Sequence, residues 1–155
     1  MDSSMNVRPA TEMEVRWVLL NPEFFPFISD GIAPIDVTVD MSEVWMLFYE
    51  GNEIVGLFNF HKITRICWEM HPMVFKKFRL KYARDCIKWA FRWFMGHKLI
   101  VRIPENRPEL LNFAKKSGFV REGINRESLM QNGAIINIIH LGITKDEINS
   151  YLEAA

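Results

Sequence analysis

The chain of 155 residues predicts an α/β fold in which one mixed β-sheet carries helices on its faces. A strand, a helix and a further strand follow one another in the middle of the sequence, and such a crossover joins parallel strands. Before and after this crossover, pairs of β-rich segments flank tight turns, and hairpins of this kind are antiparallel. The helix of the crossover carries an apolar stripe at helical spacing.

The N-terminal third predicts a short strand and a capped helix. Residues 5–9 form the strand. Residues 10–20 predict a helix, because Thr11 suits the N-cap and Glu14 completes a capping box. Residues 21–31 follow, and they predict a second short helix or a turn.

The middle of the chain predicts a hairpin and then the crossover. Residues 44–61 contain two β-rich runs around the turn Glu50–Glu53. Residues 65–71 form the next strand, and the helix that follows it ends at Gly96. The apolar residues of this helix recur at spacings of three and four: Ala83, Cys86, Ile87, Ala90, Phe91 and Phe94.

The last third predicts a strand over residues 98–104 and a short helix over residues 107–119. Pro108 fits the first turn of that helix, and a glycine ends it. A final hairpin with an Asn-Gly turn follows over residues 127–143. The remaining residues begin with Thr144 as an N-cap and end helical.

Composition excludes several classes of protein. Hydrophobic residues make up 49% of the chain, which argues against disorder. The formal net charge is zero, which argues against a general affinity for nucleic acid. The polar N-terminus lacks the apolar core of a signal peptide, and no apolar run is long enough to span a bilayer. We therefore expect a cytoplasmic protein with neither a membrane nor a nucleic-acid partner.

The two cysteines point to the same compartment. The spacing of Cys67 and Cys86 matches no zinc pattern, so no metal site is expected. Both are expected to be buried free thiols, which suits a reducing environment.

Charge is unevenly distributed along the chain. Residues 76–92 are strongly basic, whereas the first third is mostly acidic. Two regions of opposite sign suggest two different ligands, although solvated faces also explain such asymmetry. The acidic residues are Glu12, Glu14, Glu23, Asp30, Asp36, Asp40, Glu43, Glu50 and Glu53.

The order of elements resembles that of the GNAT superfamily of acyl-CoA-dependent N-acyltransferases. A segment near the C-terminus matches the family's fourth-helix motif: an Asn, a short helix, Lys-x-Gly-Phe and a trailing Glu-Gly. The final hairpin is similar to that of the branch that includes ribosomal-protein N-acetyltransferases, and residues 68–72 resemble small GNAT-like proteins of bacteriophages. The motif residues are Asn106, Lys116, Gly118, Phe119, Glu122 and Gly123.

The resemblance covers essentially the whole chain and implies one GNAT-like domain over residues 1–155. Its sheet would be mixed and mostly antiparallel, with a central parallel strand pair that splays apart and helices on both faces. The implied activity is transfer of an acetyl group from acetyl-CoA (coenzyme A) to a primary amine of a protein or a small molecule. The implied state is a monomer or homodimer, in the host cytoplasm if a phage encodes the chain.

The family's cofactor site falls on the strand near His71 and on the helix after it. The pyrophosphate binds at that helix start, where unpaired N–H groups and the helix dipole favour an anion. In the matching segment, Tyr82 and Arg84 replace small residues, and the loop from Pro72 to Arg79 looks longer than usual. Basic side chains could compensate, or they form only the solvated face of a helix. The expected cofactor-binding residues are Met70, His71, Arg79, Leu80, Lys81, Tyr82, Ala83, Arg84 and Asn106.

Acetyl transfer needs a proton acceptor, because only the neutral amine attacks the thioester. Glu69 is the first candidate, since the family commonly places a carboxylate on this strand. His71 is the second, because its pKa suits neutral pH, and alternation puts both side chains on one face. The alternatives are an ion pair of Glu69 with a basic neighbour and a His71 that caps the helix. The tyrosine acid of many family members is missing, since Ala114 holds its place.

Two functions stay open at this point. Glu69, His71 and the basic segment favour an acetyltransferase. The altered Arg79–Arg84 segment and Ala114 favour a catalytically inactive GNAT-fold protein that binds a partner or belongs to a virion. In the first case, the acidic first third would suit a cationic amine acceptor.

Overall fold

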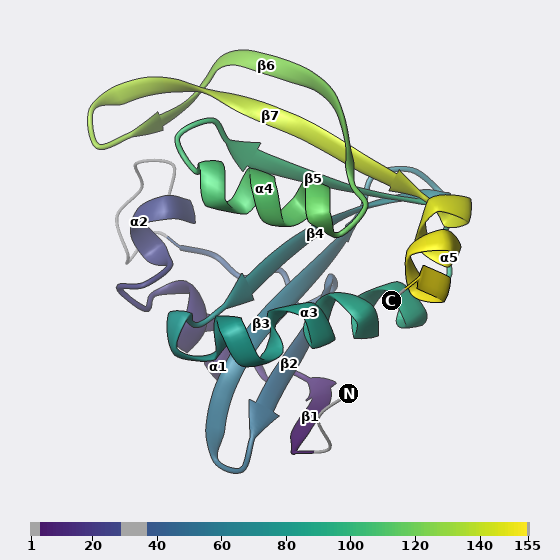
Figure 1. Ribbon diagram of the computed structural model, residues 1–155. Coiled ribbons are helices and arrows are strands. Elements are labelled where there is room, and N and C mark those ends of the chain that lie inside the picture. Colours follow the sequence, from purple (N-terminus) through teal and green to yellow (C-terminus); the bar gives the residue numbers. More distant parts are fainter. Residues whose placement is uncertain (1–3, 29–36, 155) are drawn as a thin grey trace. The chain divides into compact units, whose positions relative to one another are not determined.

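The computed structural model of the protein describes residues 4–28 and 37–154 (Figure 1). Seven strands follow one another in the hydrogen-bonded order β1-β2-β3-β4-β5-β7-β6. The pair β4–β5 is parallel, whereas β1–β2, β2–β3, β5–β7 and β6–β7 are antiparallel, which confirms the expected mixed sheet. The strands are β1 (Met5–Pro9), β2 (Val44–Glu50), β3 (Glu53–Lys62), β4 (Cys67–Val74), β5 (Lys98–Pro104), β6 (Val120–Gln131) and β7 (Ala134–Thr144). The helices are α1 (Glu12–Leu19), α2 (Phe25–Ile28), α3 (Lys76–Trp93), α4 (Pro108–Lys116) and α5 (Lys145–Ala154).

The chain divides into two compact units. The N-terminal unit comprises residues 1–61 and 70–89, and the C-terminal unit comprises residues 62–69 and 90–155. The chain therefore crosses from one unit to the other near the end of β3, within β4 and within α3. That the chain is a single domain remains a prediction.

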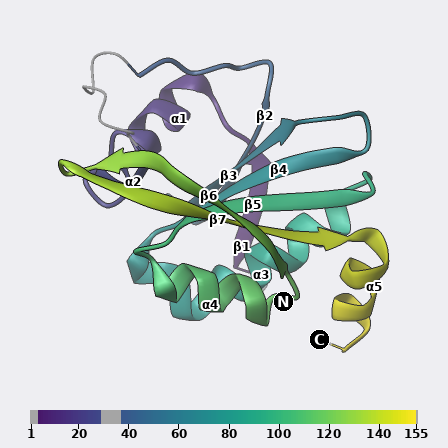
Figure 2. The same ribbon diagram turned by 90° about the horizontal axis from the view of Figure 1, so that it is seen from above.

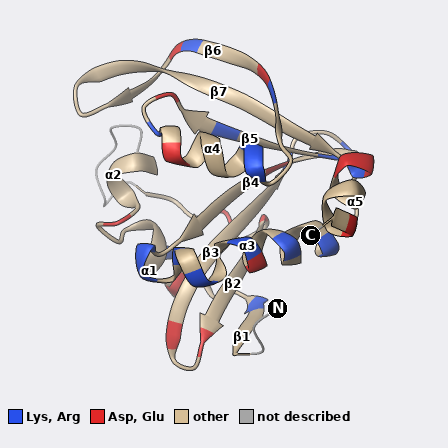
Figure 3. Cartoon of the chain, viewed as in Figure 1, with Lys and Arg blue, Asp and Glu red and all other residues tan. Residues whose placement is uncertain are grey.

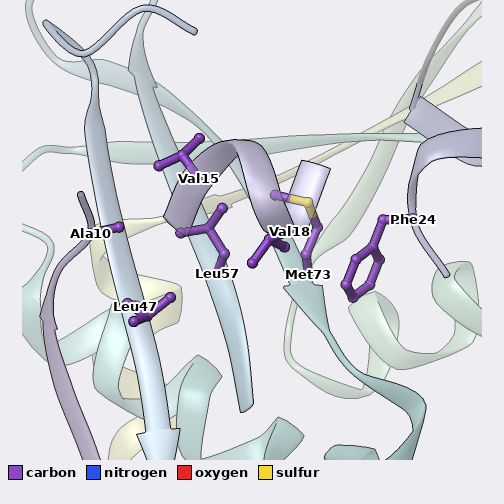
Figure 4. Packing of buried hydrophobic residues seen from close by; sticks show 7 residues of the cluster. All are labelled: Ala10, Val15, Val18, Phe24, Leu47, Leu57 and Met73. Atoms are coloured by element: carbon purple, nitrogen blue, oxygen red, sulfur yellow. The ribbon is translucent and has the colours of Figure 1, made fainter. Parts of the chain in front are cut away.

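In the N-terminal unit, helix α1 packs through an apolar cluster on the β2–β3 hairpin (Figure 4). Val15 and Val18 are fully buried, and they lie against Leu47 and Leu57. Burial of each such side chain stabilises the fold by about 1.5–3 kcal/mol. The remaining members of the cluster are Ala10, Phe24 and Met73.

The start of α1 has the predicted capping box. The Thr11 hydroxyl accepts a bond from the Glu14 N–H over 3.2 Å, and the Glu14 carboxylate accepts one from the Thr11 N–H over 2.9 Å. The short helix expected within residues 21–31 is α2, although residues 29–31 lie outside the described part of the chain, as do Asp30 and Asp36.

In the C-terminal unit, β5, β7 and β6 lie side by side, with α4 on one side of them (Figure 2). The β6–β7 turn confirms the Asn-Gly prediction, because Asn132 and Gly133 both have positive φ angles, of 51° and 77°. Gly118 follows α4 with a φ of 97°, as a C-terminal cap requires. Alternate residues form the apolar face of this sheet: Leu99, Val101, Ile103, Ile139, Leu141 and Ile143.

The start of α5 also confirms its predicted cap. The Thr144 hydroxyl lies 2.9 Å from the Glu147 carboxylate, which accepts a second bond from the Thr144 N–H. None of the described helices is both long and apolar enough to cross a membrane.

The expected long loop between β4 and α3 is absent, and this corrects the sequence prediction. Strand β4 continues through Pro72 to Val74, and α3 starts at Lys76, so that only Phe75 separates them. Contacts with β3 explain the longer strand. A Cβ on Gly56 would lie 2.4 Å from the Met73 carbonyl oxygen, and the Phe75 N–H donates to the Val55 carbonyl over 3.0 Å.

Candidate functional site

Glu69 is held in an ion pair within the C-terminal unit. The parallel ladder of β4 and β5 aligns Glu69 with Ile100, which places Arg102 two residues further on the same face. The Arg102 Nη2 donates to Glu69 Oε1 over 2.6 Å, and the Arg102 Nε donates to Glu69 Oε2. The Glu69 side chain is only 1% exposed, whereas that of Arg102 is 44% exposed.

This pair is the arrangement that the sequence left as an alternative for Glu69. The Glu69 carboxylate raises the pKa of Arg102, chiefly through the hydrogen bond. Both carboxylate oxygens therefore bind a permanent cation, which makes proton uptake by Glu69 costly. A catalytic role for Glu69 remains a prediction, and the pair weakens it.

Met70 and His71 belong to the N-terminal unit, one step further along β4. Met70 is buried, with 1% of its surface exposed, and His71 is half-buried. Because Glu69 lies in the other unit, the expected placement of Glu69 and His71 on one face stays a prediction. Binding of the cofactor by Met70 and His71 also stays a prediction.

The segment expected to bind pyrophosphate lies inside α3. Arg79 is in the first turn, where its Nε donates to the Val74 carbonyl over 2.9 Å. The N–H groups from Leu80 to Arg84 follow the first turn, so the helix ladder uses them. The backbone N–H groups of residues 80–84 are therefore not available to a phosphate, and binding of the cofactor by these residues remains a prediction. Among the side chains of that segment, Leu80 is fully exposed, Ala83 is half-buried and Arg84 is exposed.

A carboxylate already binds at the start of α3. The Lys76 N–H donates to Glu23 Oε2 over 2.9 Å, and the Phe78 N–H donates to the Phe75 carbonyl over 2.8 Å. Glu23 thus satisfies one of the N–H groups that a phosphate would use. Any anion that binds there has to displace this side chain.

Basic side chains of α3 form ion pairs with acidic residues that flank the β2–β3 turn. Figure 3 shows the basic residues along α3 and the acidic residues at that end of the hairpin. Lys77 pairs with Glu53, and the Lys81 Nζ lies 3.5 Å from Glu50 Oε2. These pairs support the alternative in which Lys77 and Lys81 form a solvated face.

Tyr82 is a core residue of the N-terminal unit. Its side chain is completely buried, and its hydroxyl lies 2.6 Å from Ser4 Oγ and donates to Glu50. Phe78 packs against its ring with centroids 6.0 Å apart. Packing thus explains a tyrosine at this position, and a role of Tyr82 in cofactor binding remains a prediction.

Asn106 lies in an exposed turn between β5 and α4, within the C-terminal unit. The N-cap of α4 is the next residue, Arg107, which makes no side-chain capping bond. The role of Asn106 in cofactor binding remains a prediction.

Neither cysteine has the properties of a nucleophile. Burial raises the pKa of the Cys67 thiol, and burial raises that of Cys86 to about 12. Both thiols are free, Cys86 is buried and Cys67 is partly exposed. At the place of the missing tyrosine acid, Ala114 is buried and Phe113 beside it has no proton to give. Within the described residues, no cluster of His, Cys, Asp or Glu could hold a metal ion.

Sequence reasoning missed Arg102 and Glu23. The signal for Arg102 was present, because it shares a face with Ile100, the parallel partner of Glu69. The contact of Glu23 with Lys76 could not be predicted from local sequence patterns, because the two residues lie 53 positions apart.

One protein-family model matches most of the chain. The family is described as "Protein of unknown function (DUF2824)", and its model matches residues 35–154. A search of curated proteins finds no match.

Solved structures with the same fold include two forms of a polyamine enzyme. A chimera of the spermidine N-acetyltransferase SpeG from Vibrio cholerae and hSSAT has a TM-score of 0.78 at 15% identity, and the match covers 95% of this chain and 99% of that chain. The Vibrio cholerae spermidine N-acetyltransferase in complex with CoA and spermine has a TM-score of 0.76 at 14% identity, covering 96% and 99%. These likenesses show the fold and confirm the GNAT-like architecture.

Proposed function

Because this chain belongs to the DUF2824 family, whose description names no activity, we propose its function from the fold: an acetyl-CoA-dependent N-acetyltransferase that acts on a primary amine. The observation that carries the proposal is the likeness, over 96% of the chain, to a spermidine N-acetyltransferase solved with CoA and spermine. The same fold supports many functions, so the proposal also depends on the chemistry of particular residues in this chain.

The start of α3 fits an anionic cofactor by its charge. Its first turn contains Lys76, Lys77 and Arg79 and no acidic residue, and the helix dipole adds to the positive potential. We assign the phosphates of acetyl-CoA to the Lys76 N–H and to the side chains of Lys76, Arg79 and Arg84. Glu23 leaves its hydrogen bond when the phosphates bind. The cofactor, when bound, supplies the acetyl thioester.

His71 replaces Glu69 as the first candidate for the proton acceptor. Arg102 holds both oxygens of Glu69, whereas histidine is the side chain that enzymes use most often as a general base. In this role His71 takes the proton from the amine, directly or through water, as the nitrogen becomes nucleophilic. Glu69 and Arg102 then act as a structural pair that joins β4 to β5 within the C-terminal unit.

The acceptor is a primary amine of a small molecule or a protein. The acidic residues of the first third favour a cation by charge. The solved neighbours act on polyamines, and this supports a small cationic amine as the first class to test.

The experiment is a transfer assay that follows release of free coenzyme A with a thiol reagent and the acetylated product by mass spectrometry. The acceptors are spermidine and a peptide with a free N-terminus and a lysine. We expect acetyl-CoA-dependent product, with a His71→Gln variant about 100-fold slower in kcat and a Glu69→Gln variant within fivefold of the parent rate. Absence of product from every acceptor, with acetyl-CoA intact, would contradict the proposal.

A second candidate function is a GNAT-fold protein without catalysis that binds a partner. The hydrogen bond from the Lys76 N–H to Glu23 favours it, because the chain itself occupies part of the anion site. The two candidates separate on cofactor binding, which the catalytically inactive protein does not require. This second proposal includes a phage as the source of the chain and a virion as the particle that contains it.

A further inference from the structure

The N-terminal unit has a small pocket at one end of the β1–β2 ladder. The two strands pair as far as Pro9 and Met46, and the Ala10 N–H then donates to the Trp45 carbonyl over 2.9 Å. The pocket has a volume of about 190 Å³, below the usual range of drug-sized sites, so only a small ligand fits. The lining residues are Pro9, Ala10, Met41, Glu43, Val44, Trp45 and Met46.

The walls of this pocket are apolar and held in place. Six of the seven lining residues carry apolar side chains, so most of a bound ligand meets hydrocarbon. The Trp45 indole N–H donates to the Asp40 carbonyl over 2.9 Å, which fixes the ring. The Ser42 N–H donates to the Asp40 carboxylate over 2.9 Å, which fixes the turn that contains Met41. An indole ring attracts a cation as well as hydrocarbon, and a methionine thioether adapts to irregular shapes.

Glu43 is the one charged residue among the described residues that line the pocket. Its side chain is 21% exposed, and its Oε2 lies 3.2 Å from Nδ1 of His61. The other oxygen, Oε1, has no hydrogen-bond partner in the part of the chain that the structure describes. A carboxylate oxygen accepts hydrogen bonds only, so Oε1 is left to bind a donor from a ligand.

The arginines of β1 and α1 are matched by other carboxylates. Arg8 Nη1 donates to Glu14 Oε1 over 2.8 Å, and Arg16 Nη2 lies 3.3 Å from Glu12 Oε1. The charge of Glu43 in the wall therefore repels an anion. A neutral hydrocarbon would take water from this carboxylate without replacing its hydrogen bonds. A primary ammonium replaces them, because it carries a positive charge and N–H donors on one nitrogen.

We infer that this pocket binds a small cation with a hydrocarbon chain, of the primary alkylammonium class. Its nitrogen donates to Glu43 Oε1, and its chain packs against Met41 and Trp45. The pocket lies at the start of β2, whereas α3, which holds the proposed cofactor site, meets the end of that strand through Lys81 and Glu50. The binding is therefore separate from the proposed acetyl transfer and does not depend on it.

The test is an NMR titration of the full chain with n-hexylammonium, read on the indole ¹H–¹⁵N signals. The chain has five tryptophans, and a Trp45→Phe variant identifies the signal of Trp45, so the others remain as internal controls for binding elsewhere. n-Hexanol and n-hexanoate are the matched ligands, since they keep the chain and replace the cation with a neutral group or an anion.

Two variants address the pocket, each with a matched control in the same unit. Glu43→Gln removes the charge and keeps a similar shape, and Glu12→Gln does the same at a residue paired with Arg16. Met41→Ala shortens an apolar wall at a residue that is 42% exposed, and Met13→Ala makes the same change on α1, where the side chain is 81% exposed. Thermal unfolding checks that each variant is folded.

We expect hexylammonium to shift the Trp45 signal with a Kd of about 1 mM, the range of a ligand with about seven non-hydrogen atoms. Glu43→Gln should weaken this binding at least tenfold and Met41→Ala about threefold, whereas both controls should bind like the parent protein. Hexanol or hexanoate binding as tightly as hexylammonium would overturn the inference, and so would unchanged affinity in Glu43→Gln. Absence of a Trp45 shift at tenfold above the expected Kd would overturn it as well. No outcome of this titration depends on whether the protein transfers an acetyl group.

Discussion

Glu69 and Arg102 are joined by two hydrogen bonds, one of them 2.6 Å long between Arg102 Nη2 and Glu69 Oε1. The carboxylate is buried, whereas the guanidinium reaches solvent. The pair links β4 to β5 at the end of their short parallel ladder. A buried carboxylate without its cation is strongly unfavourable, so the two residues depend on each other for stability.

Replacement of Arg102 should therefore cost more than loss of an ordinary surface charge. We expect Arg102→Leu to lower the free energy of unfolding by about 2 kcal/mol in urea titrations, a value reduced from that of a fully buried pair because Arg102 is half exposed. The matched control is Lys98→Leu on the same strand, whose exposed pair with Glu122 should contribute under about 1 kcal/mol. Equal losses in the two variants would show that burial of Glu69 does not govern the effect.

Tyr82 stands where the motif compared in the sequence analysis has a glycine, and a glycine at this position should damage the protein. Tyr82→Gly removes a fully buried ring and places a glycine inside α3. We expect a loss of about 4 kcal/mol in the free energy of unfolding, from the cavity and the lower helix propensity. Tyr82→Phe should cost only about 1 kcal/mol through its lost hydrogen bonds. A Tyr82→Gly protein as stable as the parent and with tighter cofactor binding would contradict the core role of this residue.

Under the proposed assignment of the cofactor, Glu23 competes with phosphate for the start of α3. Glu23→Gln keeps a hydrogen-bond acceptor for the Lys76 N–H but removes the charge. We expect acetyl-CoA to bind several-fold more tightly to this variant, as measured by calorimetry. Glu12→Gln is the control, because it removes the same charge on α1 from a residue paired with Arg16. An equal gain in both variants would attribute the effect to net charge alone.

Local sequence signals predicted most of the fold. The capping box at Thr11, the N-cap at Thr144 and the Asn-Gly turn each depend on residues close in the chain, and all three are present. The end of β4 was missed, because Pro72 usually marks an interruption. Here the contact of Met73 with Gly56, 17 residues away, keeps the strand in place.

The candidate site was harder to predict than the fold. Glu69 was selected from the sequence as the first candidate for the proton acceptor, and its partner Arg102 lies 33 positions later. Tyr82 was interpreted from its place in a family motif, whereas its packing against Phe78 and its bond to Glu50 depend on the tertiary fold. Sequence spacing alone contains neither relationship.

The most direct test of the central claim is a calorimetric titration of the intact chain with acetyl-CoA. We predict micromolar binding that weakens at least tenfold in Arg79→Ala, since this residue lies in the basic first turn of α3. Arg92→Ala, at the other end of the same helix, should bind like the parent protein. Absence of detectable binding at millimolar acetyl-CoA would contradict the account and favour the protein without catalysis.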